Sequence, residues 1–151
     1  MTWSNLFQIV NLAALILWLV LVIAPRWHGI FDQFRLVGVG ALCCFYVVLV
    51  STALSAGFGA GSGTAPDFST VAGIRAIFAT DGGVVTGWTH YLAFDLFAGI
   101  WIAEDSDRRG LSRIIQAPIL ALTFLAGPAG MFLYLLVTRV GGSRSSLDRA
   151  G

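Results

Sequence analysis

The sequence predicts an all-α membrane protein with four transmembrane helices in two antiparallel hairpins and a short interfacial helix in the middle loop. Three observations lead to this fold class. Of the 151 residues, 57% are hydrophobic and only 11% are charged, whereas soluble domains carry about a quarter charged residues. The mean hydropathy is +0.83. Four apolar segments are long enough to cross about 30 Å of hydrocarbon as helices.

The four predicted spans cover residues 5–24, 35–54, 84–103 and 114–137. Short loops join the first span to the second and the third to the fourth, so each pair is expected to form an antiparallel hairpin. Together they make one membrane domain. The polar residues 138–151 are expected to form a disordered tail.

The middle loop, residues 55–83, has two parts. Its first part is glycine-rich and is expected to be flexible. Its second part has apolar residues at helical spacing, which predicts a short helix lying in the membrane interface. These residues are Phe68, Val71, Ile74 and Phe78.

An even number of spans predicts that both termini lie on the same side of the membrane. The first apolar segment lacks the positive n-region of a cleavable signal, so we expect it to remain as a span in a bacterial inner membrane. The net charge of +1 and the absence of a basic arm argue against a nucleic-acid partner. The expected partner is the lipid bilayer, and a homo-oligomer is left open.

The third span carries two side chains that are costly in hydrocarbon, His90 and Asp95. On a helical projection Asp95 shares a stripe with Trp88, Tyr91 and Gly99, whereas His90 faces another direction. Asp95 is therefore the leading candidate for function, with a buried structural carboxyl group as the alternative. For His90, a functional role and a hydrogen bond to a neighbouring helix are equally compatible with the sequence.

The fourth span is expected to fold back so that Gly127 and Pro128 lie opposite Asp95. Proline removes a helical hydrogen bond and kinks the helix, and glycine leaves open space beside it. Asn11 in the first span and Tyr134 in the fourth are expected to face the bundle interior as hydrogen-bonding groups.

An acidic and basic cluster follows the third span. Asp105 lies three residues before Arg108 and four before Arg109, a spacing that predicts structural ion pairs at a helix end. A Mg²⁺ site for a diphosphate substrate is the alternative, but no second acidic motif completes it. The adjacent Cys43 and Cys44 are interpreted as small apolar helix residues. No metal is expected.

Several of these elements occur in the order of a known family. The stretch from Trp88 to Phe97, then Asp105, Arg109, Pro118 and "LTFLAGPAG" at residues 122–130 resemble the abscisic-acid-deficient-four family. Its members are small four-span membrane proteins needed for neoxanthin synthesis in plants, with relatives in bacteria. The resemblance is good over residues 87–139 and rests on length and hydropathy in the first half. The chain is interpreted as a bacterial member.

The resemblance implies an isomerisation without redox change, in which the epoxide end of a carotenoid becomes an allenic end. Such a step needs an acid to open the epoxide and a base to remove a neighbouring proton. Asp95 is the candidate acid, and His90 is the candidate base or a group that orients the substrate. No cofactor is expected. The candidate substrate-binding residues are Trp88, Tyr91, Trp101, Asn11, Tyr134, Gly127 and Pro128.

Two further function classes remain open from the sequence. The first is a membrane protein that binds or assembles a lipid or pigment without turnover, which the aromatic residues suit as well. The second is a small transporter that uses Asp95 as a proton site, which would need an oligomer because one bundle of four spans offers little room for alternating access.

Overall fold

The computed structural model describes residues 2–26, 29–55 and 67–147, with side chains up to Arg139, and all regular structure in these ranges is helical. Most of the glycine-rich part of the middle loop, residues 56–66, lies outside this description. In chain order the helices are α1 (Trp3–Ile23), α2 (Ile30–Gln33), the π-helical η1 (Phe34–Val39), α3 (Gly40–Ser55), α4 (Val71–Phe78), α5 (Asp81–Arg108), α6 (Arg113–Leu125) and α7 (Gly127–Leu147).

The first two predicted spans are confirmed as long apolar helices. α1 and the continuous helical path through α2, η1 and α3 are each long and apolar enough to cross a membrane. Their outward side chains are apolar: Leu12 is 60% exposed and Val37 is 66% exposed. These two helices support membrane association.

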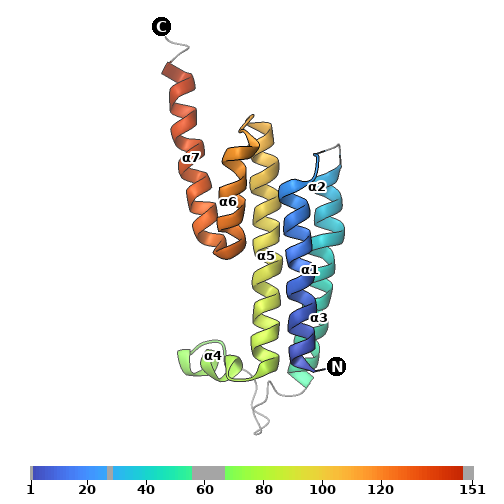
Figure 1. Ribbon diagram of the computed structural model, residues 1–151. Helices are drawn as coiled ribbons and strands as arrows, with labels where there is room; N and C mark the ends of the chain where they lie inside the picture. The colour runs from blue at the N-terminus through green and yellow to red at the C-terminus, as the bar shows by residue number, and fades with distance from the viewer. Residues whose placement is uncertain (1, 27–28, 56–66, 148–151) are drawn as a thin grey trace.

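The third predicted span corresponds to a helix, α5, which lies at the centre of the bundle. Among the described helices, only α1 and the α2–η1–α3 path are candidate membrane spans by length and hydropathy, so α5 is not confirmed as a span. α5 extends from Asp81 to Arg108, and the hydroxyl of Thr80 caps its start by accepting the N–H of Gly83 at 3.0 Å. It packs against α1, α3, α6 and α7 (Figure 1). Because other helices surround most of it, α5 can accommodate polar side chains that an outer apolar helix would not.

The predicted fourth span, residues 114–137, is wrong as a single helix. The chain leaves helical geometry at Ala126, with φ −156° and ψ 81°, and α6 and α7 lie side by side as a hairpin (Figure 1). Pro128 stands in the first turn of α7, where the missing backbone N–H costs nothing. Proline alone does not end a helix here, because Pro118 lies inside α6. With 13 residues, α6 is only about 20 Å long and does not cross the hydrocarbon.

The hairpin also changes where the chain ends. α7 runs back beside α6 and extends to Leu147, so the start of α1 and the end of α7 lie at opposite ends of the bundle (Figure 1). The expectation that both termini lie on one side depended on a complete fourth crossing. The helix also covers much of residues 138–151, for which a disordered tail was predicted.

The short helix expected in the middle loop is present as α4, which lies across the end of the bundle (Figure 1). The hydroxyl of Thr70 accepts the N–H of Gly73 at 3.1 Å and so caps its start. Ile77 is buried, whereas Val71 and Phe78 are exposed. α4 therefore presents one apolar side to the bundle and another to its surroundings.

Candidate functional site

The structure brings Asp95 of α5 against the tip of the α6–α7 hairpin. Asp95 is only 7% exposed, and its carboxyl group lies so close to Gly127 that a Cβ atom there would be 2.7 Å from the carboxyl carbon. Gly127 has no side chain and so leaves the space that this carboxyl group occupies. Asp95 and Gly127, which the sequence analysis placed opposite one another, are neighbours.

The hairpin tip is tied to α5 beside this contact. The hydroxyl of Tyr91 donates to the backbone carbonyl of Leu125 at 3.0 Å. This carbonyl belongs to the last turn of α6, where helical partners are missing. Within the tip, α6 and α7 approach closely, because a Cβ at Gly130 would lie 2.5 Å from the Cα of Thr123. Two glycines and one tyrosine thus fix the tip at the depth of Asp95.

Two buried polar atoms near this tip have no hydrogen-bond partner among the described residues. One is Oδ2 of Asp95, and the other is the indole Nε1 of Trp18 on α1. Trp18 packs against Gly99, one turn from Asp95 along α5, and against Phe124 of α6. An unsatisfied acceptor and an unsatisfied donor on one side of α5 are costly when buried, so they mark a place where a polar group of a ligand or a water would be stabilised.

Aromatic side chains extend from Asp95 towards the N-terminal ends of α1 and α5. The rings of Phe7 and Trp88 have centroids 6.0 Å apart, and those of Trp88 and Tyr91 are 5.3 Å apart. The indole N–H of Trp88 donates to the side-chain oxygen of Asn11 at 2.9 Å. We call Phe7, Trp88 and Tyr91 the aromatic row. Trp88 is 39% exposed and Phe7 is 36% exposed, so the row has an open side.

A cavity of about 390 Å³ continues the aromatic row at the end of the bundle, between the first turns of α1 and α5. Phe7 belongs to both features. The cavity combines apolar and polar lining side chains: Trp3, Ser4, Phe7, Gln8, Asp81, Val84 and Val85. Such a mixture suits a ligand with an apolar body and a polar end.

His90 does not join this site. It is exposed on another face of α5, where its ring lies 5.5 Å from that of Tyr46 and 4.7 Å from that of Phe94. The helical projection predicted that His90 and Asp95 point in different directions. The structure agrees, and it does not assemble them as an acid–base pair.

Trp101 and Tyr134 lie together at the far end of α5, away from Asp95. Their rings meet edge to face at 5.6 Å. Tyr134 is 1% exposed, and its hydroxyl donates to the carboxylate of Asp105. Tyr134 therefore joins α7 to α5. Its assignment to substrate binding would require it to border Asp95, and it does not. Pro128 is exposed at the hairpin tip and remains near the candidate site.

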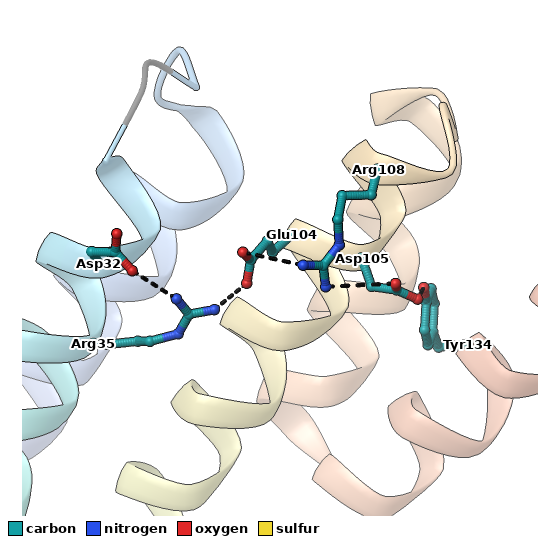
Figure 2. A network of polar contacts seen from close by, with 6 residues as sticks. All are labelled: Asp32, Arg35, Glu104, Asp105, Arg108 and Tyr134. Carbon is teal, nitrogen blue, oxygen red and sulfur yellow. Dashed lines mark hydrogen bonds and ion pairs between the residues drawn. The ribbon is translucent and has the colours of Figure 1, made fainter.

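Figure 2 shows the polar network at this far end of α5. The ion pairs expected from spacing are present, with Arg109 Nε 2.6 Å from Asp105 and Arg108 Nη2 3.7 Å from it. The hydroxyl of Tyr134 and the guanidinium of Arg109 hold the pKa of Asp105 below its usual value. Arg35 extends the network to η1 through its ion pair with Glu104. The carboxylates are thus engaged in joining helices.

Sequence reasoning missed two residues of the site, Phe7 and Trp18. Phe7 lies one helical turn before Asn11, so the two residues share a side of α1. This spacing was the sequence signal that could have found Phe7, whose ring lies beside that of Trp88. Trp18 could be paired with Gly99 only after α1 was placed beside α5.

The family model described as ABA DEFICIENT 4-like matches residues 5–134. Neither the curated proteins nor the solved structures contain a significant match. The matched range covers α1 through to Tyr134 and includes Asp95, the aromatic row and the hairpin tip. The chain therefore belongs to the ABA DEFICIENT 4-like family.

Proposed function

We propose that this chain is a membrane-embedded isomerase, or a closely related enzyme, that acts on a carotenoid or another isoprenoid lipid. Membership of the ABA DEFICIENT 4-like family supports a role related to neoxanthin synthesis. The observation that carries the proposal is the carboxyl group of Asp95. It is buried at the hairpin tip, its Oδ2 atom has no hydrogen-bond partner in the described part of the chain, and an aromatic row leads away from it.

In the proposed membrane arrangement, α1, the α2–η1–α3 path and α5 cross the bilayer, and the α6–α7 hairpin enters it from one side. The membrane is a bacterial inner membrane, and α4 lies in its interface. Exposed apolar side chains on the outer helices support this placement, among them Leu12, Val37 and Phe132. Because the hairpin reaches only to the depth of Asp95, an elongated apolar ligand has lateral access to the half of α5 beyond the tip.

The aromatic row would hold the apolar body of such a ligand by stacking, and the polar end group would reach Asp95. In its acid form Asp95 would donate a proton to the epoxide oxygen as the carbon–oxygen bond breaks. The resulting carboxylate would then take a proton from the neighbouring carbon of the polyene. The electrons of the broken carbon–hydrogen bond form the new double bond of the allene. This isomerisation consumes no net proton. One carboxyl group can therefore serve both steps, and His90 is not needed as the base.

The alternative is a protein that holds or delivers a lipid or pigment without changing it. The position of His90 favours this alternative, because the structure does not place the second predicted catalytic group beside Asp95. A binding protein would use the same aromatic row and cavity. The two functions therefore differ in whether bound ligand is converted.

The decisive experiment measures conversion by purified protein in mild detergent. An epoxy-carotenoid is added, and an isomer of unchanged mass is sought by chromatography and mass spectrometry. We expect Asp95→Asn to lower the rate by at least about a hundredfold, since general acid–base groups contribute about 10²- to 10⁴-fold. His90→Ala should keep most of the activity. Asp32→Asn is the matched control, because Asp32 is 83% exposed at the other end of the molecule.

Three results decide between the functions. Conversion that persists in Asp95→Asn contradicts the assignment of Asp95 as the acid. Conversion lost in His90→Ala restores His90 as a catalytic group. A lipid or pigment that co-purifies with the wild-type chain and is never converted supports the binding protein.

A further inference from the structure

One face of α5 is left open between α3 and α7. Its exposed side chains recur at helical spacing on α5, so they form a single stripe, which we call the open stripe. Phe94 is 60% exposed, Phe97 is 48% exposed and Trp101 is 36% exposed. His90 completes the stripe at its N-terminal end, beside Tyr46 of α3.

The open stripe brings together two hydrogen-bonding side chains from different helices, His90 of α5 and Tyr46 of α3. Within the described residues, neither the imidazole of His90 nor the hydroxyl of Tyr46 forms a hydrogen bond, although their rings lie 5.5 Å apart. His90 lies about 7 Å from the centre of α5 along the helix axis. In the proposed membrane arrangement this position is inside the hydrocarbon, where lipid tails cannot satisfy either group.

We propose that the open stripe is the interface of a symmetric homodimer. A two-fold axis brings the same surface of two copies together. His90 of one copy then contacts Tyr46 of the partner subunit, and Tyr46 contacts His90 of the partner subunit. Tyr46 would donate its hydroxyl proton to an imidazole nitrogen of His90 of the partner subunit, and the reverse bond would form by symmetry. One chain offers a donor and an acceptor side by side, which is the self-complementary pattern that such an axis requires.

A second copy also satisfies the packing of the stripe. Phe94 and Phe97 would leave the lipid and pack against the same rings of the partner, which favours offset or edge-to-face contacts. The inference rests on the membrane placement of α5 but not on the chemistry of Asp95, which lies on another face of the helix. Failure of one proposal therefore does not decide the other.

The two cysteines of the chain provide a built-in test. Both are exposed on α3. Cys43 lies three residues before Tyr46 and is close to the same side of the helix, whereas Cys44 points about 100° further round. In the proposed dimer, Cys43 lies near the edge of the interface and Cys44 faces away from it.

The experiment uses full-length protein in bacterial membranes and a short thiol-specific cross-linker. We expect Cys44→Ala, which keeps Cys43, to give a covalent dimer on a denaturing gel, and Cys43→Ala to give little. Equal cross-linking of both variants, or no cross-linking of either, would overturn the proposed interface. A wild-type chain that is monomeric in native mass spectrometry would also overturn it.

The dissociation constant of the dimer tests the hydrogen bonds between His90 and Tyr46 of the two copies. His90→Leu is expected to raise the dissociation constant of the dimer about tenfold in detergent, because each substitution removes two symmetry-related hydrogen bonds. Phe132→Leu is the matched control, since Phe132 is exposed on α7 outside the stripe. An unchanged dissociation constant for His90→Leu, or an equal change for Phe132→Leu, would contradict the role of His90 and Tyr46 in the interface.

Discussion

Replacing Gly127 with alanine tests the contact between the hairpin tip and α5. The new Cβ would lie 2.7 Å from the carboxyl carbon of Asp95, well inside the separation of about 3.5–4.0 Å at which carbon atoms pack. Asp95 has little room to move because it is buried, and Tyr91 holds the tip through the carbonyl of Leu125. Overpacking of this kind costs about 1–3 kcal/mol.

Alanine also brings a gain, because glycine is about 1 kcal/mol less favourable than alanine in a helix. Gly127 begins α7, where this gain is smaller than in a helix interior. We therefore expect Gly127→Ala to lower the free energy of unfolding by about 1–2 kcal/mol. Gly40→Ala is the matched control. A Cβ at Gly40 would meet only the carbonyl oxygen of Arg35, at 3.6 Å, so this variant should be neutral or slightly more stable.

The assay is reversible unfolding in detergent micelles, combined with hydrogen exchange of residues 120–132. A double-mutant cycle identifies the partner, because Asp95→Ala removes the carboxyl group that the new methyl group would meet. In that background Gly127→Ala should cost little, which gives a coupling energy of about 1–2 kcal/mol. An equal cost of Gly127→Ala in both backgrounds would refute the contact between the tip and Asp95.

Three further predictions concern the same bundle and use the same unfolding assay. Tyr134→Phe should lower stability by about 1–3 kcal/mol, because it removes the hydrogen bond to the Asp105 carboxylate, and an unchanged value would contradict that bond. The pKa of Asp105 is lowered in the folded protein, so its stabilisation is complete above about pH 4 and is lost as the pH falls through the folded pKa. Asp105→Asn should abolish this acid-dependent loss. Gly99→Ala would place a Cβ 2.8 Å from Cζ3 of Trp18 and closer still to the neighbouring ring carbon. It should destabilise the bundle by about 1–3 kcal/mol, and Trp18→Leu should relieve that loss.

The sequence predicted local features well where one helix was sufficient to decide them. The separation of His90 from Asp95 follows from 100° per residue on α5, and the pairing of Asp105 with Arg109 follows from a spacing of four. Both required only the knowledge that the segment is helical. The cap at Thr70 and the short helix α4 were likewise local.

The sequence analysis failed where one apolar segment can form either a single span or two shorter helices. The apolar run from Ile114 to Val137 satisfies the length of a span, but Pro128 starts a new helix and the run folds into α6 and α7. Composition cannot distinguish a kinked helix from a reversed one, since proline permits both. The contact of Gly127 with Asp95 and of Gly130 with Thr123 stabilises the reversed form.

The amino-acid sequence by itself therefore determined that the chain is helical and apolar, that it belongs to its family, and that Asp95 is the unusual residue of its central helix. Hydrophobicity, helical periodicity and ordered motifs are properties of neighbouring residues, and a single chain displays them without folding. Only the tertiary structure decided that Asp95 meets a hairpin tip, that Phe7 and Trp18 border its surroundings, and that His90 and Tyr134 lie elsewhere. Those facts depend on how side chains from separate helices fill space together, and close contacts between helices are set by shape rather than by the pattern of any one segment.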